Sequence, residues 1–127
     1  MDRRKLELKQ RTKRFAGRII RPYVALPLRR AELAVLGRQM LRSGTSVAAN
    51  YREASRARSP NEFVSKIELC AQEADETQLW LELLRDDCGV KCQELDSLWT
   101  EADELIAIFV TMSKNTKQNN KDRKAET

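Results

Sequence analysis

The sequence predicts an all-α protein that folds as an antiparallel, up-down-up-down four-helix bundle. Apolar and small residues recur at alternating steps of three and four along the chain, which is the period of a helix packed along its neighbours. Gly and Pro are scarce, and no segment alternates between apolar and polar residues as a half-buried strand does. We therefore predict one bundle domain over residues 1–115, followed by a polar, disordered tail over residues 116–127.

The first predicted helix lies within residues 1–28. Its apolar side is formed by Leu8, Phe15, Ile19 and Tyr23. Pro22 lacks the N–H that would bond to the carbonyl of Arg18, so we expect it to kink this helix or to end it nearby. Pro27 then belongs to the connection.

The second predicted helix begins at about Arg29 and ends before the short basic joint at residues 56–59. Its three-four seam is formed by Leu33, Leu36, Met40, Ser43, Val47, Asn50 and Ala54. Gly44, Ala48 and Ala49 are small, which lets a neighbouring backbone come close. We expect this helix to be the most tightly packed of the four.

The third predicted helix has the clearest start signal. Ser59 is a good N-cap, Pro60 suits the first helical position, and Glu62 stands three residues after the cap, where it can bond back. We expect the helix to run to about Asp87, with Gly89 as its stop. Its seam is formed by Phe63, Ile67, Cys70, Ala74, Thr77, Leu81, Leu84 and Cys88. Further apolar residues lie off this seam, so either the first helix or a neighbouring subunit should cover them, namely Leu69, Leu79, Trp80 and Leu83.

The fourth predicted helix runs from about Lys91 to Asn115. Its seam is formed by Leu95, Leu98, Ala102, Leu105, Phe109 and Met112. Beyond it the sequence is polar throughout and has no apolar period, which is the reason for predicting a disordered tail.

Positive charge is concentrated at both ends of the sequence. Residues 1–30 hold eleven Lys or Arg against two acidic residues, and residues 114–127 hold five against two, whereas the intervening segment is acidic. Two interpretations are open. The basic first helix lies beside acidic helices of the bundle or of a neighbouring subunit, or it presents a positive surface to nucleic acid. The residues that we predict for such a surface are Arg11, Lys13, Arg14, Arg18 and Arg21.

A polar side chain on the seam of the second helix needs hydrogen-bond partners. Asn50 is that residue, and a buried amide is costly unless it is bonded. We predict a polar network formed by Arg42, Ser46, Asn50, Glu53, Glu73 and Glu76. Such a network either fixes the register of the helices or forms a binding site at an oligomer interface.

The residue types that are absent exclude most catalytic chemistry. The chain has no His, so Ser-His and Cys-His arrangements and Glu-x-x-His metal sites are excluded from one chain. Its three cysteines cannot complete a four-thiolate zinc site. We therefore predict no enzyme, no cofactor, no metal and no small-molecule substrate. With neither a membrane-spanning segment nor a signal peptide, the protein should be cytoplasmic.

Three motifs resemble a known bacterial family. They are the run from Gln39 to Ala54, the helix start Ser59-Pro60-x-Glu62-Phe63, and the stretch Glu73-x-x-Glu76-Thr77-Gln78-Leu79. Together, over about residues 15–113, they are similar to four-helix-bundle proteins encoded in intervening sequences of large-subunit ribosomal RNA genes. The resemblance implies a cytoplasmic homopentamer with a basic surface for nucleic acid and no established enzymatic activity. Where many members of that family have an Asn-Ile-Ala-Glu-Gly run, this chain has Asn50-Tyr51-Arg52-Glu53-Ala54, without the Gly.

Two hypotheses of function follow. The first is a homo-oligomer that binds RNA or DNA through the phosphate backbone, because the chain has few aromatic residues for stacking on bases. The second is a scaffold that docks another protein through the same basic helix and binds no nucleic acid.

Overall fold

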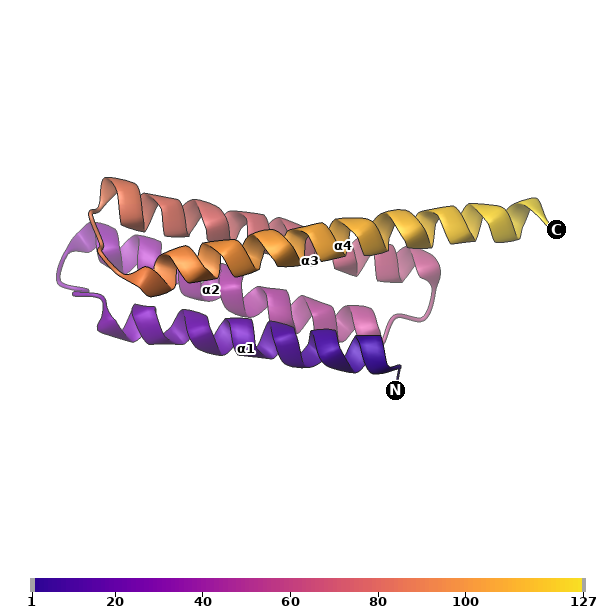
Figure 1. Cartoon of the computed structure of the whole chain (residues 1–127), viewed down its shortest axis with the longest axis horizontal. Coiled ribbons are helices and arrows are strands. Elements are labelled where there is room, and N and C mark those ends of the chain that lie inside the picture. The colour runs from indigo at the N-terminus through magenta and orange to yellow at the C-terminus, as the bar shows by residue number, and fades with distance from the viewer. Residues whose placement is uncertain (1, 127) are drawn as a thin grey trace.

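The computed structural model of the chain describes residues 2–126 and consists of four long helices whose sequence neighbours run antiparallel (Figure 1). The helices are α1 (Arg3–Ala25), α2 (Ala31–Ser55), α3 (Pro60–Glu82) and α4 (Gln93–Ala125), and a π-helical turn, η1 (Leu83–Asp87), continues α3. The described residues contain no strand. The predicted all-α, up-down-up-down bundle is confirmed.

Proline residues shape the end of α1 and the turn that follows. The helix continues for three residues beyond Pro22, which is buried, and ends at Ala25. The backbone then becomes extended at Leu26, whose N–H donates to the carbonyl of Tyr23. Pro22 therefore lies inside the helix, and the helix ends near it, as the sequence predicts, because Pro27 disfavours the helical conformation of Leu26 before it.

The close approach of α1 and α2 depends on glycine. A Cβ at Gly44 would stand 2.7 Å from Cγ1 of Ile19, and one at Gly37 would stand 2.8 Å from Cδ1 of Leu26. The small residues predicted for α2 thus include one that lets α1 pack tightly, while the contribution of Gly37 was not foreseen.

Both ends of α3 follow the sequence signals. The hydroxyl of Ser59 accepts a hydrogen bond from the N–H of Glu62 at 3.1 Å, and the Glu62 carboxylate accepts one from the N–H of Arg58 at 3.3 Å. The second bond reaches one residue further back than a standard capping box. At the other end Gly89 has a φ of 70°, the left-handed conformation that a glycine stop adopts.

The structure corrects the predicted end of the fourth helix. α4 does not stop near Asn115 but continues to Ala125, so the part of the tail that is described is helical. Lys, Gln and Arg are good helix formers, and Lys117 contacts Glu68 of α3 at 3.3 Å. Helix propensity and local charge pairs therefore extend the helix without an apolar face.

The core lies along the bundle axis, and its seam in α2 differs from the predicted one. Tyr51 and Gly37 are buried, whereas Asn50 and Leu36 are only partly buried. The ring of Tyr51 stacks on that of Phe109 in α4, with centroids 6.3 Å apart. Burial raises the pKa of Tyr51 to about 12. An uninterrupted three-four period cannot by itself show which of two adjacent positions, Asn50 or Tyr51, is buried. Tyr51 is the buried one because it has the larger apolar surface to remove from water.

Candidate nucleic-acid interface

Two of the five predicted nucleic-acid residues of α1 are engaged by α4. The Arg11 guanidinium donates to both oxygens of Glu101, at 2.8 and 2.7 Å, and to Glu104 at 3.0 Å. Arg18 donates to Glu94 at 3.0 Å and also to the hydroxyl of Ser97. For these two arginines the first interpretation of the charge pattern holds, because acidic groups of the bundle neutralise them.

The other three predicted residues face solvent. Lys13, Arg14 and Arg21 are exposed, and among the residues that the structure describes none has a carboxylate partner. Three residues are thus available to an external anion, whereas Arg11 and Arg18 hold α1 to α4.

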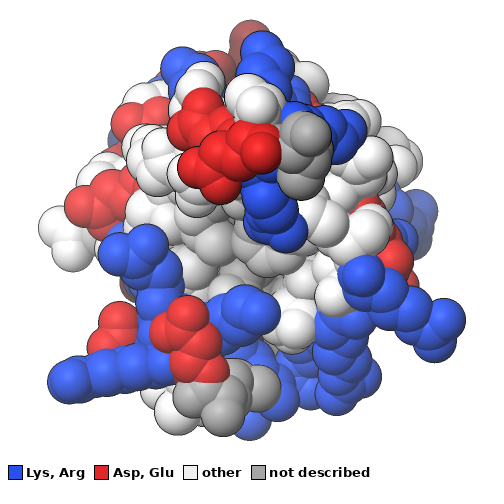
Figure 2. Space-filling view, turned by 90° about the vertical axis from the view of Figure 1, so that its right-hand side faces the viewer, with Lys and Arg blue, Asp and Glu red and all other residues white. Residues whose placement is uncertain are grey.

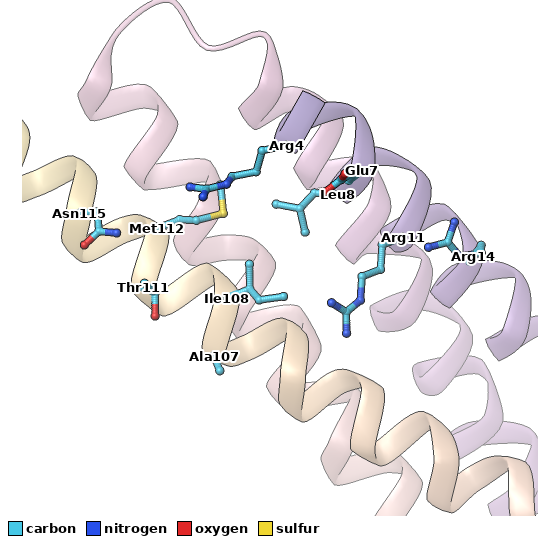
Figure 3. A pocket seen from close by; sticks show the side chains of 10 residues that line it. All are labelled: Arg4, Glu7, Leu8, Arg11, Arg14, Ala107, Ile108, Thr111, Met112 and Asn115. Carbon is cyan, nitrogen blue, oxygen red and sulfur yellow. The ribbon is translucent and has the colours of Figure 1, made fainter. Parts of the chain in front are cut away.

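A groove lies between the first half of α1 and the middle of α4, because these two helices pack only loosely against each other (Figure 3). Its volume is about 730 Å³. Arg4 and Arg11 extend from α1 towards α4, whose wall is formed largely by Ala107, Ile108 and Met112. The α1 wall is mainly basic but also holds Glu7, and the α4 wall is mainly apolar but also holds Thr111 and Asn115.

Lowering the pH is expected to loosen α1 from α4. The hydrogen bonds from Arg11, together with its charge, hold the pKa of Glu101 below its ordinary value of 4.5. A carboxylate with a lowered folded-state pKa stabilises the fold above pH 4.5, and this contribution is lost as the pH falls through the folded-state pKa. The melting temperature, followed by circular dichroism from about pH 7 to about pH 3, should fall less for Glu101→Gln than for the wild type. Identical pH profiles would contradict this assignment.

The predicted polar network forms only in part. Arg42 donates to Glu73 at 3.2 Å, to Glu76 at 2.9 Å and to Gln39 at 3.1 Å, and so joins α2 to α3. The other predicted members lie outside this cluster. Ser46 offers only its backbone carbonyl, which accepts a bond from the Asn50 amide within α2, and Glu53 pairs with Lys66.

The displacement of Asn50 from the seam explains this correction. Because Asn50 is only partly buried, its amide needs no partner on another helix. The buried polar contact between α2 and α3 is instead the 2.8 Å hydrogen bond between the hydroxyls of Ser43 and Thr77. Ser43 and Thr77 both belong to predicted seams. A hydroxyl at a seam position on each of two adjacent helices was therefore the sequence signal for this hydrogen bond.

Further cations gather at the end of the bundle where α1 begins and α2 ends. Figure 2 views the molecule from this end, where Lys and Arg side chains are more prominent than Asp and Glu. We call the following residues the basic end: Arg52, Arg56 and Arg58 at the close of α2 and in the next loop, and Lys114, Lys121 and Arg123 in the last turns of α4. The sequence signals were the basic joint and the basic tail, which the fold brings to one end.

The described part of the chain holds no cluster of metal ligands, and its buried cysteine is poorly suited to act as a nucleophile. No cluster of three or more His, Cys, Asp or Glu could hold a metal ion among residues 2–126. Burial raises the pKa of the Cys70 thiol to about 12, so the reactive thiolate is disfavoured at neutral pH. None of the described helices is sufficiently long and apolar to cross a membrane.

Comparisons with known proteins converge on one family. The family model described as 23S rRNA-intervening sequence protein matches residues 4–111. A crystal structure from Bacteroides thetaiotaomicron, of a protein with unknown function from the S23 ribosomal protein family, superposes with a TM-score of 0.76. It is 34% identical, and the match covers 84% of this chain and 97% of that one. No curated protein matches this chain significantly.

Proposed function

Because the chain belongs to the 23S rRNA-intervening sequence protein family, we propose that it is a cytoplasmic, non-enzymatic homo-oligomer that binds RNA through the basic surface of α1. The observation that carries this proposal is that only some of the α1 cations form ion pairs within the chain. Acidic residues of α4 neutralise Arg11 and Arg18, yet Lys13, Arg14 and Arg21 remain exposed. Exposed cations that the fold does not use for its own ion pairs suit phosphate groups.

Recognition of the RNA should depend on shape and charge. None of the seven aromatic side chains of the chain is exposed, so the described surface offers no platform on which an unpaired base would stack. Phosphate contacts carry no sequence information by themselves. We therefore expect similar affinity for duplexes of different sequence.

Assembly into a homo-oligomer is supported by apolar side chains that one chain leaves uncovered. Of the four apolar residues off the seam of α3, Trp80 and Leu83 are half-buried within the chain, whereas Leu69 and Leu79 remain 37% and 46% exposed. On α1, Ile20 and Val24 remain 46% and 71% exposed. Such surfaces favour contact with another copy of the chain, and the number five comes from the family resemblance alone.

Size exclusion with light scattering, run with and without a structured RNA, tests the proposal. We expect a mass near five chains of 14.7 kDa, which takes up RNA in about 50 mM salt and releases it in about 200 mM salt. The variant with Lys13→Glu and Arg14→Glu should bind about tenfold more weakly. The variant with Arg29→Glu and Arg38→Glu changes the charge equally and serves as the control.

The outcomes separate the two hypotheses of function. An oligomer that does not bind RNA at low salt would contradict the RNA-binding proposal. It would favour the second hypothesis, a scaffold that docks another protein. A monomer would contradict the proposed assembly. Equal losses in the α1 variant and in its control would show that binding follows net charge rather than the surface of α1.

A further inference from the structure

We propose that the basic end is a second contact surface for double-helical RNA, beside the exposed cations of α1, with the last turns of α4 acting as an arm along the phosphate backbone. This inference rests on the proposed RNA binding and adds a surface to the one on α1. The sequence places the cations of this surface in two separate segments, at the close of α2 with the next loop and in α4, and only the fold brings them together at the end where α1 begins.

Contacts between the helices establish that these two segments and the start of α1 meet at one end. The buried Tyr51 of α2 donates a hydrogen bond to the carbonyl of Lys5 near the start of α1, at 3.5 Å. Arg4 at the start of α1 and Asn115 of α4 line the same groove. Further along α4, Lys121 shares a second groove with Pro60 and Asn61 at the start of α3. The start of α1, the end of α2 and the final turns of α4 therefore surround one end of the bundle.

The side chains of the basic-end cations form no ion pairs among the described residues, although Glu53 and Glu62 line the same hollow as the three arginines. Arg52, Arg56 and Arg58 form no ion pair with a described carboxylate, and the same holds for Lys114, Lys121 and Arg123. At the opposite end Arg30 and Arg85 are bound by neighbouring acidic groups, whereas Arg29 and Lys91 are exposed and form no ion pair with a described carboxylate. The basic end thus holds more of these unpaired cations than the opposite end does.

The shape of α4 supports the role of an arm. Figure 1 shows α4 extending beyond the ends of the other three helices. Residues 114–124 include no apolar side chain, so this part of the helix buries no core of its own. A helix that is polar all round gains stability mainly from charge interactions. Residues 116–125 span about 15 Å, which corresponds to about nine phosphate charges along a duplex axis.

The lateral face of α1 is less suited to a purely ionic contact. There Lys13 and Arg21 alternate with the exposed apolar residues Ile20 and Val24, which a neighbouring subunit is expected to cover. The basic end would stay open in such an assembly, and the number of subunits would multiply its charge. The basic end therefore adds a purely ionic contact to the one that the exposed cations of α1 offer.

Double-helical RNA fits this surface better than an anionic membrane does. Helices that bind membranes carry an apolar face that enters the lipid, and the exposed arm of α4 has none. Single strands are held largely by stacking on aromatic side chains, and none is exposed. A duplex instead presents dense, regular phosphates that scattered Lys and Arg contact without stacking.

Charge reversal in the full-length protein tests the inference by fluorescence anisotropy with a labelled RNA hairpin. One variant carries Arg52→Glu, Arg56→Glu and Arg58→Glu, and another carries Lys114→Glu, Lys121→Glu and Arg123→Glu. Each should weaken binding by tenfold or more and lower the slope of log affinity against log salt by about two to three. The matched control, with Arg29→Glu, Arg38→Glu and Lys91→Glu, should lose less than about threefold. Circular dichroism checks that each variant is folded.

The outcomes distinguish this inference from the proposed function. If the wild type fails to bind the hairpin at low salt, the proposed function falls. If the wild type binds and the two variants lose no more affinity than the control, the inference about the basic end is wrong, while the proposed RNA binding is retained. Binding to phosphatidylserine vesicles as tight as to the hairpin, or tighter binding of an unstructured oligouridine with the same number of phosphates, would overturn the choice of a duplex.

Discussion

Replacing Phe109 with Ala is expected to lower the free energy of unfolding by about 3–5 kcal/mol. Phe109 is completely buried, and its ring stacks on Tyr51 across the bundle with centroids 6.3 Å apart. Truncation would remove the apolar transfer energy of the ring and leave a cavity among rigid helices. It would also remove the aromatic contact that joins α2 to α4.

Denaturation in urea, followed by circular dichroism at one fixed protein concentration, measures this effect. The fixed concentration matters because assembly of subunits would add to the apparent stability. Tyr51→Phe is the matched control, since it keeps the ring and loses only the long 3.5 Å hydrogen bond to Lys5. That change should cost about 1 kcal/mol or less. A loss below 1 kcal/mol for Phe109→Ala would mean that the bundle can collapse around the site.

Periodicity was sufficient to predict most of this core. The steps of three and four in the last helix correctly place Leu98, Ala102, Leu105 and Phe109 on the buried side of α4. The same reasoning failed in α2, where it chose Asn50 over the adjacent Tyr51. A helix turns by about 100° per residue, so neighbouring positions can both border a seam, and only the partner helix determines which one is enclosed.

The candidate site was harder to predict, because the sequence shows which residues are charged but not which partners their side chains face in the fold. Arg11, Arg14 and Arg18 look equivalent along the first helix, yet acidic residues on α4 bind the first and the last. Those carboxylates lie more than seventy positions further along the chain, and their register against α1 is a property of the folded bundle. The basic end was missed for the same reason, since its residues are neighbours only in space.

The extension of α4 has a different physical origin. Apolar periodicity ends near Ser113, and a prediction based on burial therefore ends the helix there. Helix propensity needs no burial, and the tail is rich in residues that favour helices. Gln118 also donates to Asp122 one turn later, at 2.9 Å.

Substituting Gly44 with Leu is expected to lower the free energy of unfolding by about 3 kcal/mol, although Leu is the better helix former. A Cβ at Gly44 would lie 2.7 to 3.2 Å from three carbons of the Ile19 side chain. Ile19 is completely buried, and its branched Cβ restricts its rotamers, so it has little freedom to move away. The added side chain must therefore push α1 away from α2.

The other helical glycines supply controls for this prediction. At Gly37 the closest atom is Cδ1 of Leu26, the mobile end of a side chain, so Gly37→Ala should cost less than Gly44→Ala. At Gly17 a Cβ would meet nothing within 4 Å, and Gly17→Ala should stabilise α1 by roughly 0.5–1 kcal/mol. Urea denaturation of the three Ala variants should rank Gly17 above Gly37 and Gly37 above Gly44. Gly44→Ala as stable as Gly17→Ala would mean that helix propensity, rather than the close approach of α1, sets stability at this position.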